Sequence, residues 1–259
     1  MTRIITIANQ KGGVGKTTTT VNIAAAMAQA GKTVLVIDLD PQGNATTALG
    51  IDHPEGTPGI YDVLMGETVL AEVITPCPDV PQLFGIPATI DLAGAEVELV
   101  STPNREHRLR EEIEQLLHTT HFDYIFLDCP PSLGLLTLNG LVAAREVLLP
   151  IQCEYYALEG LSQLLKTVDM IKEHLNPELY VTAIILTMYD GRTRLASQVA
   201  DEVRNHFGAR VLETIIPRNV RVSEAPSYGQ TVLTYDPASS GAVSYREAAA
   251  QLDIIQQPS

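Results

Sequence analysis

The stretch Ala8-Asn9-Gln10-Lys11-Gly12-Gly13-Val14-Gly15-Lys16-Thr17-Thr18 decides the fold that this sequence predicts. A β-branched run at residues 3–7 precedes it, and an alanine-rich apolar segment at residues 21–30 follows it. A strand, a glycine loop and a helix in this order bind phosphate, because successive N–H groups point into one concavity and the helix N-terminus adds partial positive charge. The competing interpretation is a glycine-rich turn before an ordinary helix. From average residue usage, chance gives these residue types at these spacings in only about 10⁻⁵ of chains of this length.

The side chains of this loop suit a nucleoside triphosphate with Mg²⁺. Lys16 can reach the β- and γ-phosphates, and the Thr17 hydroxyl can ligate Mg²⁺. The usual loop has a glycine five residues before Gly15, where this chain has Gln10, and an additional lysine, Lys11, precedes the glycines. This pattern resembles the deviant Walker A motif of the ParA/MinD family of P-loop ATPases. The resemblance implies that Lys11 crosses a dimer interface to the partner's nucleotide. The expected ATP contacts of the loop are Lys11, Gly12, Gly13, Val14, Gly15, Lys16, Thr17 and Thr18.

Composition excludes several classes of protein. The 259 residues carry a formal net charge of −14, which argues against general attraction to DNA or anionic lipid. No apolar run is long enough to span a bilayer, no signal-peptide pattern begins the chain, and the three cysteines have no CxxC spacing, so a reduced, cytoplasmic protein is expected. Between residues 188 and 228 there are six arginines and five acidic residues, a net charge of about +1 (six minus five). This region should therefore repel a polyanion least.

Short β-branched runs alternate with helical segments along the whole chain, which predicts an α/β fold with a mostly parallel, twisted sheet flanked by helices on both faces. Residues 50–82 are predicted to be a surface excursion with one short helix at 61–65. Thr102-Pro103 is predicted to start a helix, with the Thr102 hydroxyl as N-cap, and residues 105–117 are expected to form its charged, amphipathic, solvated part. Further helices are expected at 161–172 and 195–207. Strands are expected at residues 3–7, 32–37, 83–86, 124–128, 146–150, 181–188 and 211–216.

Carboxylates follow two of these strands, at the edge where open α/β sheets bind ligands. Asp38 and Asp40 end one strand, and Asp128 ends another in the manner of a Walker B segment. We expect Asp38 and Asp128 to hold Mg²⁺ through its bound water, and Asp40 to hold the attacking water. The alternative for Asp38 and Asp40 is a polar turn with a helix cap. The family resemblance favours Asp40 for the water, because the second aspartate of this switch segment is the one needed for hydrolysis there.

Two further residues lie next to the predicted site. Cys129 follows the Walker B aspartate and invites comparison with nitrogenase iron protein, but it stands too close to the nucleotide to bridge a cluster between subunits, so a buried structural cysteine is expected. Glu154 lies in the segment Glu154-Tyr155-Tyr156 at another strand end, where the family has a glutamate near the nucleotide and dimer interface. A site role and a helix-capping role both remain open for Glu154.

The segments that begin with the expected strands at 181–188 and 211–216 resemble the ParA/Soj chromosome-partitioning ATPases. With the earlier motifs, the resemblance extends from residue 3 to about residue 250. A polar loop at residues 217–227 suits a base-binding wall, because its carbonyls can accept from an adenine amino group. By the resemblance, Met188, Pro217, Arg218 and Asn219 lie near adenine. Arginines that match Arg192 and Arg221 contact DNA non-specifically in the family.

The resemblance implies a single P-loop ATPase domain over residues 1–259, without the N-terminal helix-turn-helix extension of larger plasmid-type relatives or the basic membrane helix of MinD-type relatives. It implies slow ATP hydrolysis with Mg²⁺, with Lys11, Lys16 and Asp40 as catalytic residues. The expected partners are a second copy in an ATP-dependent homodimer, double-stranded DNA and a ParB/Spo0J-type centromere-binding protein that stimulates hydrolysis. The ATP-bound form would associate with the nucleoid. Two alternatives stay open: a positioning ATPase for another cargo, and a metabolic P-loop ligase of the dethiobiotin-synthetase type.

Overall fold

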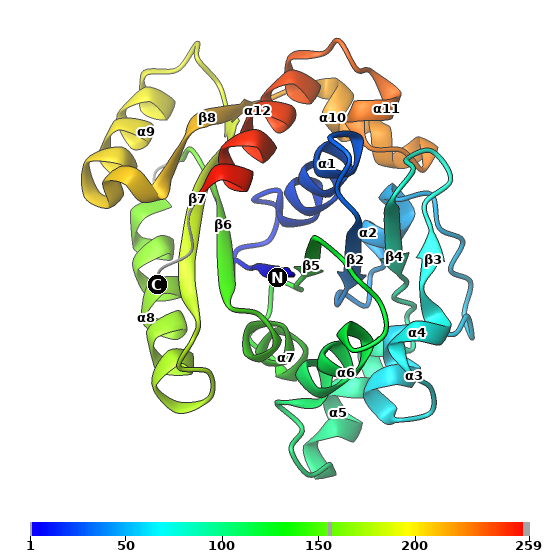
Figure 1. Cartoon of the computed structure of the whole chain (residues 1–259). Coiled ribbons are helices and arrows are strands. Elements are labelled where there is room, and N and C mark those ends of the chain that lie inside the picture. The colour runs from blue at the N-terminus through cyan, green and yellow to red at the C-terminus, as the bar shows by residue number, and fades with distance from the viewer. Residues whose placement is uncertain (1, 155–156, 256–259) are drawn as a thin grey trace.

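Eight strands form one sheet in the order β3-β4-β2-β5-β1-β6-β7-β8 in the computed structural model, which describes residues 2–154 and 157–255 (Figure 1). All neighbouring strands run parallel except β3, which pairs antiparallel with β4 at the edge. The strands are β1 (Arg3–Ile7), β2 (Val34–Asp38), β3 (Thr75–Pro76), β4 (Leu83–Ile86), β5 (Tyr124–Asp128), β6 (Glu146–Gln152), β7 (Tyr180–Tyr189) and β8 (Val211–Pro217). The predicted α/β class with a mostly parallel sheet is confirmed.

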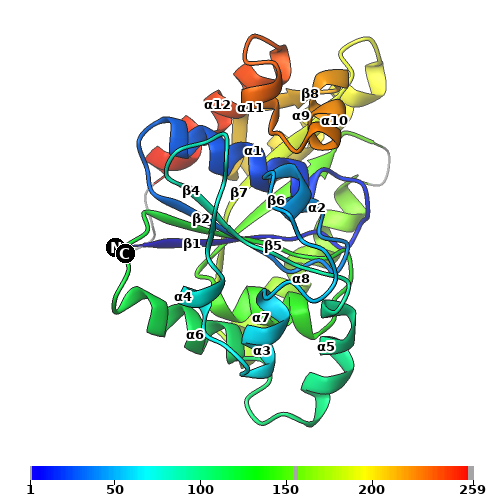
Figure 2. The ribbon, with the colours of Figure 1, turned by 90° about the vertical axis from the view of Figure 1, so that its right-hand side faces the viewer.

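Helices cover both faces of the sheet (Figure 2). On one face lie α1 (Lys16–Gln29), α2 (Asn44–Ala48), α10 (Val220–Glu224), α11 (Val232–Tyr235) and α12 (Ser240–Ile254). The other face is covered by α3 (Ile60–Met65), α4 (Leu70–Val73), α5 (Leu92–Glu98), α6 (Arg108–Leu117), α7 (Leu135–Ala143) and α8 (Ala157–His174). Beside β8 lies α9 (Arg194–Phe207), which packs with α8. Three short 3₁₀ turns are η1 (Leu99–Ser101), η2 (Gly208–Arg210) and η3 (Ala225–Tyr228).

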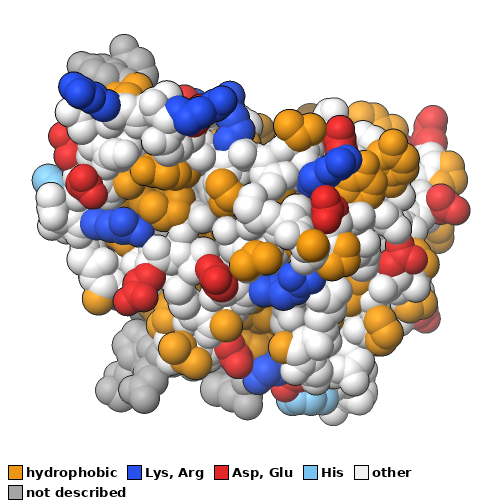
Figure 3. All heavy atoms as spheres, turned by 90° about the horizontal axis from the view of Figure 1, so that it is seen from above, with side chains coloured by type: hydrophobic (Ala, Val, Ile, Leu, Met, Phe, Trp, Pro, Cys, Tyr) orange, Lys and Arg blue, Asp and Glu red, His pale blue; other side chains and the backbone are white. Residues whose placement is uncertain are grey.

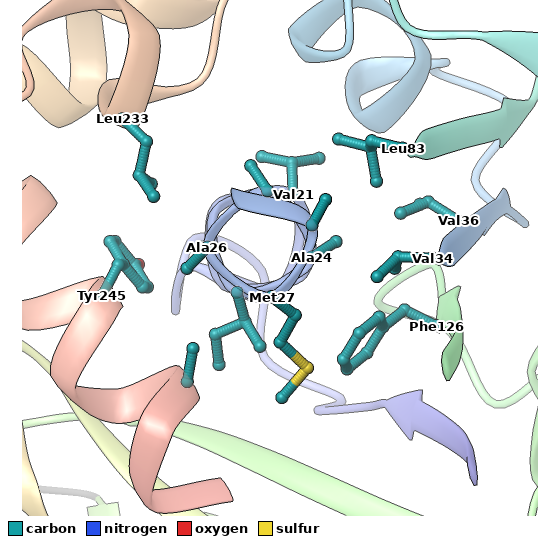
Figure 4. Close-up of a cluster of buried hydrophobic side chains, with 14 of the residues drawn as sticks. Val21, Ala24, Ala26, Met27, Val34, Val36, Leu83, Phe126, Leu233 and Tyr245 are labelled. Atoms are coloured by element: carbon teal, nitrogen blue, oxygen red, sulfur yellow. The ribbon is translucent and has the colours of Figure 1, made fainter. Parts of the chain in front are cut away.

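The central helix α1 fixes the phosphate-binding loop to the core. It lies between the sheet and α12, with Val21, Ala24 and Met27 among the side chains that fill the space (Figure 4). Its alanines let the helix axis approach both neighbours closely, and the cluster extends to Phe126 of β5 and Tyr245 of α12. Because β1 and α1 are both buried, the loop that joins them is held at both ends.

The structure corrects the expected start of the helix that ends at residue 117. Thr102 is not its N-cap: the Thr102 hydroxyl donates to the Glu98 carbonyl oxygen and so ends η1. Asn104 has a φ of 53°, which breaks any helical run there, and α6 begins only at Arg108. The helix α5, just before, was not predicted.

The segment at residues 50–82 is not merely a surface excursion. Its helix α3 buries Ile60, Val63 and Leu64 completely in the cluster below the sheet, and α4 adds Leu70. The helix predicted for residues 161–172 begins four residues earlier, at Ala157. The stretch predicted as a polar loop at 217–227 contains α10 and most of η3. Within the described residues, no helix has the length and apolar character needed to cross a bilayer.

Candidate nucleotide-binding and catalytic site

The loop between β1 and α1 has the shape of a phosphate cradle. Gly13 and Gly15 have φ values of 75° and 86°, in the left-handed region where glycine avoids a Cβ clash. The loop is also tied to the neighbouring strands: the Thr187 hydroxyl donates to the Val14 carbonyl oxygen at 2.8 Å, and the Asn9 amide donates to the Pro150 carbonyl oxygen at 2.8 Å. These bonds to the neighbouring strands hold the loop in its concave form.

Lys16 is a buried cation beside this cradle, at 7% exposure. Its ammonium donates to the Lys11 carbonyl oxygen at 3.1 Å, and burial lowers its pKa, against the opposing attraction of Asp128 and Asp40. A buried cation with one neutral partner is suited to pair with a phosphate, which supplies charge as well as acceptors.

Two buried aspartates stand side by side at the carboxyl ends of neighbouring strands, because Asp38 of β2 and Asp128 of β5 are in register. The Asp128 carboxylate accepts from the hydroxyls of Thr17 and Thr20, each at 2.7 Å. The Asp38 carboxylate accepts from Thr46, through its hydroxyl and its backbone N–H. Burial raises the pKa of both carboxyl groups, and their mutual repulsion adds to the rise for Asp38.

This donor set fits Mg²⁺. Two adjacent buried carboxylates need a countercharge, and with the Thr17 hydroxyl they offer the hard oxygen atoms that Mg²⁺ prefers. Across residues 2–154 and 157–255 there is no group of three or more histidine, cysteine or acidic side chains that would enclose a metal by itself. Mg²⁺ commonly binds through one or two carboxylates, several waters and substrate phosphates, which matches such an open arrangement.

A cavity of about 760 Å³ opens over the loop, while Asp38 and Asp128 lie buried outside its lining. Asp40 lines it, half-buried, in a turn where its carboxylate accepts from the Gln42 N–H at 3.0 Å and its own N–H donates to Asp38 at 3.1 Å. Gly12, Gly13, Gly15, Lys16, Thr17 and Thr18 of the loop line the same cavity. The structure therefore brings Asp40 to the same cavity as the glycine loop and Lys16.

A second cavity of about 350 Å³ continues from the first and shares Gly15, Thr18 and Met188 with it. All four residues expected near adenine line this cavity, namely Met188, Pro217, Arg218 and Asn219. Met188 has a φ of 51°, an uncommon backbone conformation for methionine, at the end of β7. The larger cavity over the glycine loop therefore adjoins the smaller one at these three shared residues.

Lys11 and Glu154 lie together outside both cavities. They form an ion pair, with side chains 50% and 32% exposed. Val14 is buried behind the loop and lines neither cavity. The residues 155–156 of the expected Glu154-Tyr155-Tyr156 segment lie outside the described residues.

The two arginines expected at DNA are exposed but paired with acids. Arg192 forms two hydrogen bonds to the Asp190 carboxylate, and Arg221 contacts Glu224 at 3.1 Å and Asp236 at 3.4 Å. Seen from above, lysines and arginines are dispersed among acidic side chains and do not gather in one patch (Figure 3).

Three groups at the site were not predicted from the sequence. The hydroxyls of Thr20 and Thr46 donate to the two aspartates, and Tyr245 lines the smaller cavity. Thr20 stands three residues after Thr17, so helical spacing could have predicted that the two lie on one face of the helix. The positions of Thr46 and Tyr245 depend on the tertiary fold, and no local sequence pattern predicts them. Cys129, with 1% exposure, is buried against Gly140 as expected, and burial raises its pKa.

Comparison with known proteins places the chain among nucleotide-dependent ATPases. The family model described as "AAA domain" matches residues 2–181. The sporulation initiation inhibitor protein Soj of Bacillus subtilis is 52% identical over 252 residues, covering 97% of this chain and 98% of that protein. The chromosome partitioning protein ParA of Myxococcus xanthus is 54% identical over 243 residues, covering 94% and 85%.

Solved structures agree on the fold. Cobyrinic acid a,c-diamide synthase of Mycobacterium smegmatis, with bound ADP and magnesium, has a TM-score of 0.82 at 39% identity and covers 96% of this chain and 93% of that chain. The cell division ATPase MinD of Pyrococcus furiosus has a TM-score of 0.81 at 26% identity, covering 99% and 100%.

Proposed function

The chain belongs to the Soj/ParA family of chromosome-partitioning ATPases, and we propose that MgATP closes two copies into a dimer that holds DNA without sequence preference. It is an ATPase that uses ATP and Mg²⁺ and acts in partitioning. The observation that carries the proposal is the cradle itself: a concave glycine loop, a buried lysine and two buried aspartates that meet at one edge of the sheet.

The chemistry of hydrolysis follows from these residues. The loop N–H groups and Lys16 neutralise the β- and γ-phosphates as charge develops on the leaving oxygen. Thr17 would hold Mg²⁺ directly and Asp38 and Asp128 would hold it through water, and the bound ion would supply further neutralisation of phosphate charge. Asp40 orients the attacking water from the open side of the cavity.

Dimer closure depends on Lys11 in this proposal. Its ammonium lies outside the cavities of its own chain and half-exposed, where it can reach the phosphates of a second copy. In the single chain Glu154 neutralises it. A triphosphate carries more charge than one carboxylate, so the intersubunit contact outcompetes this partly exposed pair.

DNA binding then comes from joining two weak surfaces. Arg192 and Arg221 of each copy are expected to face phosphate, and pairing two such surfaces raises avidity without new contacts. Hydrolysis, accelerated by a ParB-type partner, returns the chain to monomers that release DNA. The ATP-bound form would therefore sit on the nucleoid.

The decisive experiment measures association and turnover together. We expect a non-hydrolysable ATP analogue with Mg²⁺ to convert the monomer to a dimer in analytical ultracentrifugation, and DNA with a ParB-type partner to stimulate phosphate release. A chain that stays monomeric with saturating analogue overturns the proposal.

A second candidate function is a metabolic ligase, favoured by the 39% identity to a chain described as a diamide synthase. Such an enzyme turns over ATP only with an organic acid present. ATP hydrolysis that ignores DNA and requires a small carboxylic acid would establish this candidate in place of partitioning.

A further inference from the structure

Thr46 is a buried residue of α2 with three hydrogen bonds that converge on the site. Only 1% of the surface of Thr46 is exposed to solvent. Its hydroxyl donates to Asp38 Oδ2 at 2.7 Å, and its backbone N–H donates to the same oxygen at 2.8 Å. The hydroxyl oxygen in turn accepts from the Ala88 N–H at 3.1 Å.

These bonds join the short helix α2 to the ends of β2 and β4, two strands that already pair in the sheet. Asp38 ends β2, Thr46 lies in the five-residue helix α2, and Ala88 follows β4. A helix of five residues has little stability of its own, so its place depends on tertiary bonds such as these. Other residues of α2 and of the stretch after Ala88 line the cavity of about 760 Å³ over the glycine loop, namely Asn44, Thr47, Ala48, Ile90 and Ala93.

The influence of Thr46 extends to Asp40. The other oxygen of Asp38, Oδ1, accepts from the Asp40 N–H at 3.1 Å. A carboxylate held at Oδ2 by two donors is fixed in rotation, and its Oδ1 then fixes the backbone of Asp40. The Thr46 hydroxyl, together with the Thr46 backbone N–H, thus helps to position both aspartates of this segment.

We propose that Thr46 is a positioning residue for ATP hydrolysis, which holds Asp38 and, through it, Asp40 in the geometry that the reaction needs. The proposal rests on the ATPase function above and adds a residue that touches neither nucleotide nor metal. Partners at this remove from a metal typically contribute roughly 10- to 100-fold in activity or metal affinity.

The test compares Thr46→Val with Thr46→Ser. Valine keeps the shape and the backbone N–H but removes the hydroxyl, whereas serine keeps the hydroxyl. Thr182→Val is the matched control, because the Thr182 hydroxyl also donates to a buried carboxylate, Glu146, at 2.7 Å, at the opposite end of its strand from the site. Single-turnover hydrolysis of labelled ATP gives the rate constant, and a fluorescent ATP analogue gives nucleotide affinity.

We expect Thr46→Val to lower the rate constant by about 10-fold or more, to raise the Mg²⁺ concentration for half-maximal turnover severalfold, and to leave ATP affinity within about twofold. Thr46→Ser should stay within about threefold of the unmodified chain, and Thr182→Val should hydrolyse ATP normally. If Thr46→Val does not fold, Thr46→Cys replaces it. Cysteine matches serine in shape but donates weakly, so its rate should fall below that of serine.

Three results would overturn the positioning role: an unchanged rate constant in Thr46→Val, an equal loss in Thr182→Val, or serine and cysteine variants that are equally slow. A failure of the ATPase proposal is recognised separately, because the unmodified chain would then show no Mg²⁺-dependent hydrolysis at all.

Discussion

At the scale of single residues, whether a site residue could be predicted from the sequence depends on how far it stands from its partners along the chain. Lys16 and Thr17 were predictable, because one loop holds them at fixed spacing. Asp38 and Asp128 were predictable from a general rule, since the carboxyl ends of parallel strands meet at one edge of the sheet. The bonds of Thr46 were not, because its acceptance from Ala88 depends on how the chain between β2 and β4 folds back.

Lys11→Ala tests the residue on which dimer closure depends. We expect nucleotide affinity to stay within about threefold, because the Lys11 ammonium lines neither cavity, while dimerisation by a non-hydrolysable ATP analogue is lost. Equilibrium binding of a fluorescent analogue and sedimentation velocity measure the two effects. Lys32→Ala is the control, because Lys32 is also a partly exposed lysine and forms an ion pair with Asp253. The Lys32→Ala chain should dimerise normally. A Lys11→Ala chain that dimerises like the unmodified protein would remove Lys11 from the interface.

At the scale of elements, burial decides what sequence can predict. The seven predicted strands lie within two residues of the observed ends, because a parallel strand covered on both faces is a continuous apolar run, as β5 shows with all five residues buried. The two-residue antiparallel edge strand β3 was missed. The short helices α5 and α10 were not predicted, since they have few residues and are placed by contacts from distant segments. The Thr102-Pro103 signal misled because a local cap pattern competes with the left-handed backbone at Asn104.

A buried ionic cluster ties four elements together and should dominate stability at the edge opposite the site. Arg3 of β1 forms a bidentate pair with the fully buried Glu146 of β6, and also donates to the Leu252 carbonyl oxygen of α12; Thr182 of β7 donates to Glu146. We expect Glu146→Gln to cost about 3–5 kcal/mol of unfolding free energy, because it removes the carboxylate charge that pairs with the Arg3 guanidinium, whose side chain is only 10% exposed. Urea denaturation measures this. Glu178→Gln, which breaks the exposed pair with Arg145, should cost about 1 kcal/mol or less, and equal losses in the two variants would contradict the argument.

The acidic partners of Arg221 should restrain DNA binding by α10. Replacing Glu224 with Gln and Asp236 with Asn leaves Arg221 unpaired, so we expect the ATP-bound form to bind DNA severalfold more tightly and its salt slope to steepen by about one. Fluorescence anisotropy with a random duplex at several salt concentrations measures both. The same change of net charge on α6, across the sheet, through Glu111→Gln and Glu114→Gln, is the control (Figure 2). Equal gains in both double variants would show a general charge effect, and no gain would remove Arg221 from the DNA surface.

At the scale of the whole molecule, the negative net charge of the chain opposes the DNA binding that we propose for its arginine surface. Each chain carries a formal charge of −14, so two copies bring −28 (twice −14) to one assembly that is proposed to hold a polyanion. Sequence predicted this opposition from composition alone. It did not predict that the expected DNA arginines are each paired with acids in the folded chain.

This opposition predicts that salt acts in opposite directions on the two steps of the proposed cycle. Added salt screens the general repulsion between two acidic chains, so the dimer formed with a non-hydrolysable ATP analogue should tighten between about 50 and 300 mM KCl. DNA binding by that dimer should weaken steeply over the same range, because neutralised phosphates release counterions. Sedimentation equilibrium gives the dimer dissociation constant, and anisotropy at protein concentrations well above it gives DNA affinity free of the dimerisation step. A dimer that weakens with salt would mean that short-range contacts such as Lys11 with phosphate outweigh the repulsion of the two bodies. DNA affinity that ignores salt would mean that phosphate contacts do not hold the complex, and the arginine surface would then have no part in it.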